Sequence, residues 1–484
     1  MNLFAVKPLS RILAESEGGK HSLKRTLGPG SLIALGIGAI IGAGLFSLTG
    51  IAAAENAGPA IVLSFALAAF GCAFAGMCYS EFSTMIPVAG SAYTYAYATM
   101  GELLAWIIGW DLVLEYAVGA ATVSISWSRY VVTLLHGYGI ELPPHLIASP
   151  LQPVTLADGS VIHGYINLPA VLIVVVISLL LITGIKESAN VNAVVVIIKV
   201  TVVVVFIAAG WAFIKPANHV PFIPPNTGTF GEFGWSGILK GAGTIFFAYI
   251  GFDAVSTAAQ EARKPQKDMP IGIIGSLIIC TILYVLFAYV MTGLVPYTEF
   301  RGHAAPAALA IAATPYVWLK TAVSLAIIAG LTSVILVMLL GQSRVFYSMS
   351  RDGLVPRIFS DIHPKYRTPW RSNLVFMVFV SLFSAFAPIS WVGHMTSIGT
   401  LFAFVVVCGG VLIMRKTNPG LARPFRTPLV PLVPVLGIVV CLAMMAGLGL
   451  SNWLRLFVWL AIGLVIYFGY GRRHSHLQNA NGGK

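Results

Sequence analysis

Long runs of apolar residues alternate with short polar segments along the whole chain. The runs are long enough for the ~20 residues of a helix that crosses a bilayer, and they lack the strict alternation of barrel strands. Because a helix satisfies its own backbone groups in lipid, the pattern predicts an all-α polytopic membrane protein. We expect twelve transmembrane helices, over residues 29–53, 60–86, 98–134, 165–185, 191–214, 238–260, 271–296, 316–348, 372–388, 392–414, 429–449 and 452–471.

Composition agrees with a membrane protein, and the charge pattern predicts its orientation. Of the 484 residues, 57% are hydrophobic and only 10% are charged. The net charge of +12 arises from Lys and Arg residues that fall mostly on one side of the twelve-span arrangement, among them Lys24, Lys264 and Arg415. Such a bias marks the cytoplasmic side. We therefore expect a multi-pass protein of the plasma (inner) membrane with both termini cytoplasmic. Its basic face would meet anionic headgroups of the lipid bilayer rather than nucleic acid.

Four glycines lie close together in the first predicted span, in the stretch GIGAIIGAGLF at 36–46. Each costs a helix interior roughly 1 kcal/mol relative to alanine. Gly38 and Gly42 form a GxxxG pair, which by itself is typical of close helix packing. Gly44 lies off that face, however, and the uncharged run over 26–54 would extend ~43 Å as a straight helix. These features favour a break in the helix at Ile40–Gly44.

A second glycine-rich stretch, over 241–253, occupies the middle of the sixth predicted span. Interrupted segments at corresponding positions five spans apart are typical of transporters built from inverted repeats. The predicted fold is thus a LeuT-like five-plus-five inverted repeat with discontinuous helices 1 and 6 and two additional helices. The predicted regions are a cytoplasmic N-terminal segment (1–28), the first repeat (29–215), the second repeat (236–415), the two additional helices (428–471) and a cytoplasmic tail (472–484).

A broken helix at membrane depth offers groups that suit an amino acid. The new half-helix presents N–H donors that favour a carboxylate, and the freed carbonyls favour an ammonium group. Charged side chains are also predicted at depth, at a cost of about 2.5–3.5 kcal/mol each. Glu115 shares a helical face with Asp111, and Asp253 follows the second glycine-rich stretch. For both Glu115 and Asp253, a structural role and a functional role remain open.

The motifs resemble those of one family. The run IIGAGLF at 40–46 resembles the IIGxGIF signature in the first helix of amino acid–polyamine–organocation (APC) permeases. Supporting matches are IPVAGSAYTY at 86–95, FAYIGFD at 247–253 and SRDGLVP at 350–356. The chain looks closest to the bacterial relatives of cationic amino acid transporters.

The resemblance implies a substrate site at the two breaks. The α-carboxylate would rest on the N–H groups of Gly42, Ala43 and Gly44. Ala43 departs from the Ser or Thr that the family often has there, so a hydroxyl that could assist the carboxylate is missing. The α-ammonium would meet carbonyls, those of Ile40, Phe247, Ala248 and Ile250, with the Phe247 ring as a gate.

The resemblance also implies candidates for the side-chain pocket and for proton coupling. Glu115 and Met338 would face the substrate side chain, although core packing also accounts for Met338. Lys199 carries the one charge between residues 188 and 214, and burial favours the neutral form of a lysine. A fifth-helix lysine stands where sodium-coupled relatives hold an ion, so protonated Lys199 would donate to carbonyls near Gly38 and Ala39. Asp253 would join the proton or gating network, and a permanently paired structural lysine is the alternative for Lys199.

The expected function is secondary active import of cationic or small neutral L-amino acids by alternating access and proton-coupled symport. The alternatives are a proton-independent uniporter or exchanger and, outside the carriers, a channel. No nucleophile–base motif is present at depth, so we expect no enzyme activity. No HExxH or paired-cysteine signature is present either, so we expect no metal site and no cofactor beyond the proton as coupling ion. The sequence names no protein partner.

Overall fold

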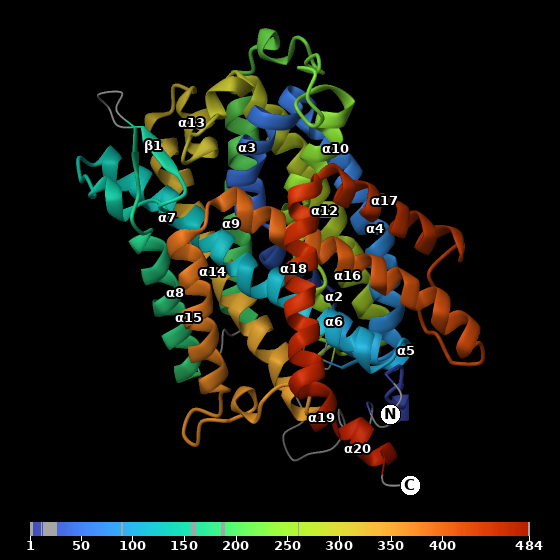
Figure 1. Cartoon of the computed structure of the whole chain (residues 1–484). Coiled ribbons are helices and arrows are strands. Elements are labelled where there is room, and N and C mark those ends of the chain that lie inside the picture. The colour runs from blue at the N-terminus through green and yellow to red at the C-terminus, as the bar shows by residue number, and fades with distance from the viewer. Residues whose placement is uncertain are drawn as a thin grey trace.

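The protein is a bundle of helices whose two termini lie at the same end (Figure 1). The structure, a computed structural model, describes residues 3–10, 12, 27–88, 91–155, 161–184, 189–259 and 261–482. The predicted cytoplasmic N-terminal segment 1–28 and the tail 472–484 therefore lie partly outside the described residues. We call the end that holds both termini the terminal end of the bundle.

The first half of the chain contributes helices that are interrupted three times by π-helical turns. The elements are α2 (Pro29–Ile40), η1 (Gly44–Leu48), α3 (Thr49–Ala52), η2 (Ala53–Ala57), η3 (Gly58–Ala60), α4 (Ile61–Met85), α5 (Ser91–Thr99), α6 (Glu102–Val113), η4 (Leu114–Val118), α7 (Gly119–Gly137), η5 (Pro144–Leu146), α8 (Leu168–Thr183), α9 (Ala189–Trp211) and η6 (Pro216–His219). A small antiparallel hairpin, β1 (Pro153–Thr155) with β2 (Val161–His163), lies between α7 and α8.

The second half contains the longest helices. Its elements are α10 (Gly234–Ile245), η7 (Phe246–Tyr249), α11 (Ala254–Thr257), α12 (Pro265–Leu294), η8 (Tyr297–Phe300), α13 (Pro306–Ala312), α14 (Val317–Arg351), η9 (Arg357–Phe359), α15 (Trp370–Phe386), α16 (Ile389–Thr417), α17 (Leu432–Gly447), α18 (Leu450–Ile466), η10 (Tyr467–Gly471), α19 (Arg472–His474) and α20 (His476–Gly482).

The helices have the length and composition of membrane spans. Among the described residues, eight helical stretches are long and apolar enough to cross a bilayer. They are Gly44–Met85, Glu102–Gly137, Ala193–Trp211, Gly234–Ser256, Pro265–Leu294, Val317–Arg351, Ile389–Thr417 and Leu450–His474. The helices α2, α8, α15 and α17 are apolar but shorter. The prediction of a helical, multi-pass membrane protein is confirmed.

Several boundaries differ from those predicted, among them the start of α12, which lies at Pro265 rather than at 271, and glycine explains two of the differences. The predicted span over 98–134 begins later, because Gly101 has a φ of +95° and separates α5 from α6. The predicted span over 29–53 continues as helix to Ala57, where Gly58 with a φ of +60° turns the chain into α4. Positive φ is readily adopted only by glycine, so each glycine ends one helix and allows the next to start in a new direction.

The interrupted segments occupy the middle of the bundle. Both α2 and α4 pack against α12, and α2 also contacts α9 and α14. In the most apolar 18-residue part of Gly234–Ser256, which contains α10 and η7, 89% is buried inside the bundle. The corresponding share for Leu450–His474 is only 22%. The central position of α2 and α10 requires their unpaired backbone groups to be satisfied by protein or by a ligand.

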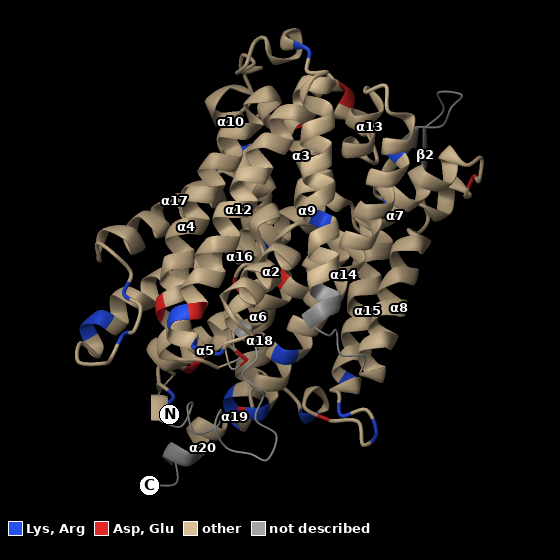
Figure 2. Ribbon diagram, turned by 180° about the vertical axis from the view of Figure 1, so that it is seen from behind, with Lys and Arg blue, Asp and Glu red and all other residues tan. Residues whose placement is uncertain are grey.

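Charged residues concentrate at the ends of the bundle (Figure 2). Blue Lys and Arg residues are most frequent at the terminal end, around the loops below α5, α8 and α15 (Figure 2). Several charges lie within the membrane-spanning stretches, and four of them, Asp111, Glu115, Lys199 and Asp253, are buried near the two breaks.

Candidate substrate and proton site

The first helix is broken where its glycines predict. Helix α2 ends at Ile40, Ile41 is extended with a ψ of 105°, and the π-helix η1 begins at Gly44. Within the described part of the chain, the N–H groups of Gly42, Ala43 and Gly44 make no hydrogen bond, and the next donor to do so is Phe46, to the Gly42 carbonyl at 3.3 Å. Three adjacent N–H donors therefore lie at the start of a half-helix, an arrangement that favours an anion.

A second break faces the first. Helix α10 ends at Ile245, the 3₁₀ turn η7 follows, and Ile250 is extended with a ψ of 136°. Gly251 then takes a φ of +115°, and a Cβ added there would lie 2.9 Å from the backbone carbon of Ala39. The backbone of the second break thus passes directly over the end of α2.

The two breaks touch at Gly44 as well. A Cβ added to Gly44 would lie 2.5 Å from the backbone nitrogen of Ala248 and would also overlap the Ala248 Cα. By contrast, a Cβ on Gly42 would meet only the Val334 side chain, at an ordinary 3.4 Å. Gly44 therefore packs closely against the backbone of η7, and Gly36, earlier in the same stretch, packs closely against the Ser276 side chain on α12.

A tyrosine that the sequence did not single out joins the two breaks. The Tyr284 hydroxyl, on α12, lies 2.9 Å from the Ile40 carbonyl oxygen and 3.0 Å from that of Ala248. A phenol has a single proton, so it donates to one of the two carbonyls at a time. Two of the four carbonyls predicted to receive the ammonium group therefore share Tyr284. A third, that of Phe247, accepts the Ile250 N–H at 3.3 Å.

Lys199 contacts the first break from α9. Its Nζ donates to the Gly38 carbonyl oxygen at 2.6 Å, and the residue is 1% exposed. Gly330, on α14, leaves room for the lysine, because a Cβ there would lie 3.1 Å from Lys199 Cγ. This contact lies at the carbonyl near Gly38 where it was expected, and the role of Lys199 in proton coupling stays a prediction.

Three buried carboxyl groups lie near one another, two on α6 and η4 and one just after the second break. Asp111 is 1% exposed, and Glu115 and Asp253 are fully buried. The Oδ2 atom of Asp253 accepts from the Tyr116 hydroxyl at 2.9 Å and from Ser91 at 3.3 Å. Among the described residues, the carboxyl oxygens of Asp111 accept no hydrogen bond, and the Glu115 carboxyl lies against the Asp253 carboxyl and the Thr400 hydroxyl. Unpaired buried carboxylates are costly, so this cluster favours a proton or a cationic group beside it.

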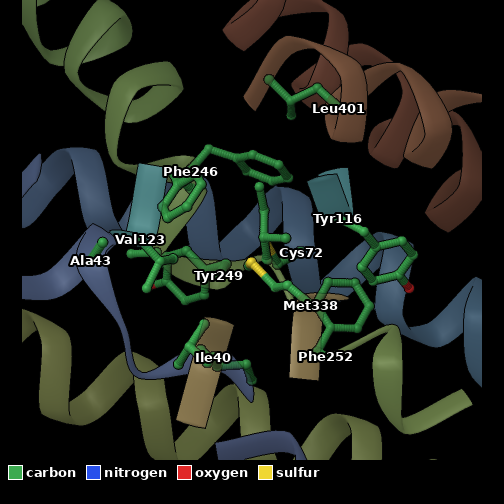
Figure 3. Packing of buried hydrophobic residues seen from close by; sticks show 14 of the residues in the cluster. Ile40, Ala43, Cys72, Tyr116, Val123, Phe246, Tyr249, Phe252, Met338 and Leu401 are labelled. Atoms are coloured by element: carbon green, nitrogen blue, oxygen red, sulfur yellow. The ribbon is translucent and has the colours of Figure 1, made fainter. Parts of the chain in front are cut away.

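Apolar side chains pack around the breaks (Figure 3). In the close-up, Ile40 and Ala43 of the first break lie near Phe246 and Tyr249 of η7, with Met338 between them and Tyr116 (Figure 3). Met338 is 5% exposed, and its sulfur would lie 3.2 Å from a Cβ added to Gly119. Phe247, the predicted gate, is 3% exposed and lies in η7 at the second break.

Comparison with known proteins decides the family. A model of the amino acid permease family matches residues 27–469. The chain belongs to this family. It is similar to the branched-chain amino acid permease BcaP of Bacillus subtilis (strain 168), with 45% identity over 98% of this chain and 99% of the relative. It is also similar to the methylthioribose transporter of the same organism, with 40% identity over the same shares of the two chains. Cationic amino acid transporter 4, vacuolar, of Arabidopsis thaliana is 30% identical over 96% of this chain and 94% of the relative.

The predicted relationship to APC permeases is confirmed, and the permease is a membrane transporter of amino acids rather than an enzyme. The structure places the candidate site residues in two groups. Ile40, Gly42, Ala43 and Gly44 of the first break lie against Ala248 and its neighbours in the second. Glu115 and Asp253 belong to the carboxyl cluster. Sequence reasoning missed Tyr284, because one tyrosine in an apolar helix carries no signal of its partners.

Proposed function

We propose that this permease imports L-amino acids across the plasma membrane by alternating access, coupled to proton symport. The observation that carries the proposal is the pair of facing breaks, with three unbonded N–H groups on one and carbonyl groups on both. The substrate carboxylate binds Gly42, Ala43 and Gly44. Its ammonium group binds the carbonyls of Ile40 and Ala248, in competition with Tyr284. The carbonyls of Phe247 and Ile250 complete the ammonium site, and the Phe247 ring closes over it.

The proposed topology has twelve spans in two inverted five-helix repeats. The first repeat is 29–215, the second is 236–415, and 428–471 adds α17 and α18. The meeting of the α2 and α10 breaks at the bundle centre supports the repeat. Both termini lie at one end, where Lys and Arg are most frequent (Figure 2). That bias supports a cytoplasmic terminal end facing anionic lipid headgroups.

Lys199 is the proposed proton site. Protonated, it donates to the Gly38 carbonyl and holds α2 against α9. Neutral, it has fewer protons to donate, so its hold on the end of α2 weakens. Proton binding and the position of the broken helix are thereby linked. Asp253, which accepts from the Tyr116 hydroxyl, is the second proposed member of the proton or gating network. The proton is the only coupling ion that the proposal requires.

The proposed substrates are small neutral or cationic L-amino acids. The apolar side chains of Val334 and Met338 beside the first break favour a neutral, branched side chain. The relative with 45% identity is named a branched-chain amino acid permease, which agrees with that choice. The buried Glu115 carboxyl instead favours a cationic side chain, as does similarity to proteins named cationic amino acid transporters.

A binding screen tests the proposal directly. Thermal shift of the purified permease with each of the twenty amino acids is expected to show stabilisation by a subset that shares the free carboxylate and ammonium. Counterflow in proteoliposomes with the best ligand should then be saturable, as a carrier requires. If none of the twenty amino acids stabilises the permease, an amino acid site at the breaks is rejected. Flux that does not saturate would favour a channel.

Glu115→Gln separates the two substrate classes. A buried carboxylate favours a nearby cationic group, so the substitution is expected to weaken lysine or arginine binding by about tenfold, the effect of one lost charge-assisted contact. Leucine and alanine binding should stay close to the parent's. Competition against a labelled substrate measures both. If the parent binds no cationic amino acid, Glu115 is structural and the substrates are neutral.

A further inference from the structure

The two ends of the chain converge on one buried carboxylate. Glu102, the first residue of α6, is fully buried. Its Oε1 accepts from the Tyr467 hydroxyl at 2.9 Å, and its Oε2 accepts from the Tyr97 hydroxyl at 2.9 Å. The C-terminal tail supplies two more donors, the Ser475 hydroxyl to Oε2 and the Gln478 amide to Oε1 at 3.5 Å. Glu102 therefore holds α5, the end of the last long helix and the tail together.

The N-terminal segment lies on the same corner between α5 and α6. The Glu102 N–H donates to the Ala5 carbonyl at 3.1 Å, and the Leu103 N–H donates to that of Leu3 at 3.0 Å. Gly101 makes this approach possible, because a Cβ there would lie 2.5 Å from the carbonyl carbon of Phe4. The segment that leads into α2 is thus bound to the start of α6.

The tail and the N-terminal segment also meet at the end of α14. Lys7 Nζ lies 2.7 Å from Asp352 Oδ1, and the Tyr93 hydroxyl donates to Asp352 Oδ2 at 2.6 Å. The His476 N–H donates to the Asp352 backbone carbonyl at 3.0 Å. The tail therefore bridges the start of α6 and the end of α14. Figure 1 shows α19, α20 and the N-terminus beside α5 at the terminal end.

This bridge lies where a carrier must open. In alternating access the helix ends at one face separate while those at the other face stay together. Opening at the terminal end separates helix ends there, and the N-terminal segment and the tail each join the start of α6 to the end of α14. Hydrogen bonds to a buried carboxylate are stronger than neutral ones, so contacts at Glu102 resist that separation.

We propose that Glu102 is a positioning residue that binds the C-terminal tail as a clamp, and that this clamp keeps the terminal end of the permease closed until the tail is released. The consequence for transport rests on the proposed alternating access. The clamp itself does not depend on the substrate or on the proton.

The contact between Glu102 and Ser475 makes the clamp sensitive to charge. Ser475 is fully buried, so a negative group at this position would lie against the Glu102 carboxylate with little water between them. Ser475→Asp should therefore expel the tail. In Ser475→Asp combined with Glu102→Gln, the glutamine amide can donate to the new carboxylate, which should restore the contact.

The test uses a cysteine at the base of the clamp. Ala5 is 9% exposed, and all five native cysteines are buried, so a charged maleimide should report chiefly on Ala5→Cys. In this background, without substrate, Ser475→Asp is expected to speed labelling by about tenfold, the effect of losing one hydrogen bond to a charged group. Deletion of residues 475–484 should do the same. The double variant with Glu102→Gln should label at the parent's rate.

His476→Asp is the matched control. It adds the same negative charge one residue away, on a side chain that is exposed rather than buried against Glu102. It should label like the parent. The clamp would be overturned if Ser475→Asp and the deletion both label at the parent's rate. It would also be overturned if the double variant labels as fast as Ser475→Asp alone. Amino acid binding, measured separately by thermal shift, tests the proposed function, so failure of one leaves the other standing.

Discussion

A Gly44→Ala permease is expected to lose substrate affinity by about 100-fold, the effect of displacing binding groups by roughly 1 Å. The added methyl group would overlap the Ala248 Cα and lie 2.5 Å from the Ala248 nitrogen. Backbone cannot yield as a flexible side chain does, so the two breaks must move apart. The N–H groups of the first break would then no longer face the carbonyls of the second. Affinity is measured by thermal shift and by competition against labelled substrate.

Gly42→Ala provides the comparison. Its new Cβ would meet only the Val334 side chain, at 3.4 Å, so the fold and the position of the two breaks should be kept. We expect a much smaller loss of affinity than for Gly44→Ala. Equal affinity in the parent and in a well-folded Gly44→Ala variant would remove the first break from the binding site.

Lys199→Ala is expected to abolish accumulation of substrate driven by a pH gradient, while counterflow persists. The substitution removes the group that donates to the Gly38 carbonyl at 2.6 Å, so proton binding can no longer bias the position of α2. The substrate groups at Gly42, Ala43 and Gly44 are untouched, which is why exchange without a gradient should continue. The measurement is uptake in proteoliposomes with and without an imposed gradient, and the accumulation ratio should fall to about one.

Lys199→Arg distinguishes loss of charge from loss of proton exchange. An arginine keeps the positive charge and can still donate to the carbonyl, but it does not release its proton in the working pH range. It should bind substrate without coupled accumulation, like Lys199→Ala. Gradient-driven accumulation by a well-folded Lys199→Ala variant would instead show that Lys199 has only a structural role.

The features that could be predicted from the sequence depend on residues close together in the chain. Apolar runs of sufficient length indicate helices in a membrane protein regardless of their neighbours, and the observed helices overlap those segments. The break after Ile40 was predictable because Gly42 and Gly44 weaken a helix wherever it packs. The Lys199 contact could be anticipated because a lone buried lysine needs an acceptor, although its position on the neighbouring helix came from family resemblance.

Partners distant in the chain could not be predicted in this way. Nothing near Tyr284 indicates that its hydroxyl lies between the Ile40 and Ala248 carbonyls, which are supplied by two other segments. The GxxxG pair suggested packing at Gly42, whereas the tight contact is made by Gly44 against Ala248. In the sequence, Glu102 is likewise typical of an acidic residue in the first turn of a helix, where it stabilises the N-terminus. Its hydrogen bonds to the tail depend on the folded arrangement of both termini.

Coupling of amino acid and proton movement at the first break is the central claim, and one measurement tests it most directly. Proteoliposomes containing the parent permease are prepared with an alkaline interior, and labelled substrate is added outside at a lower pH. We predict accumulation above the external concentration, followed by release when a protonophore collapses the gradient. Equal initial rates and equal final levels with and without the pH gradient, in vesicles that still show saturable counterflow, would contradict proton-coupled symport and leave a uniporter or exchanger.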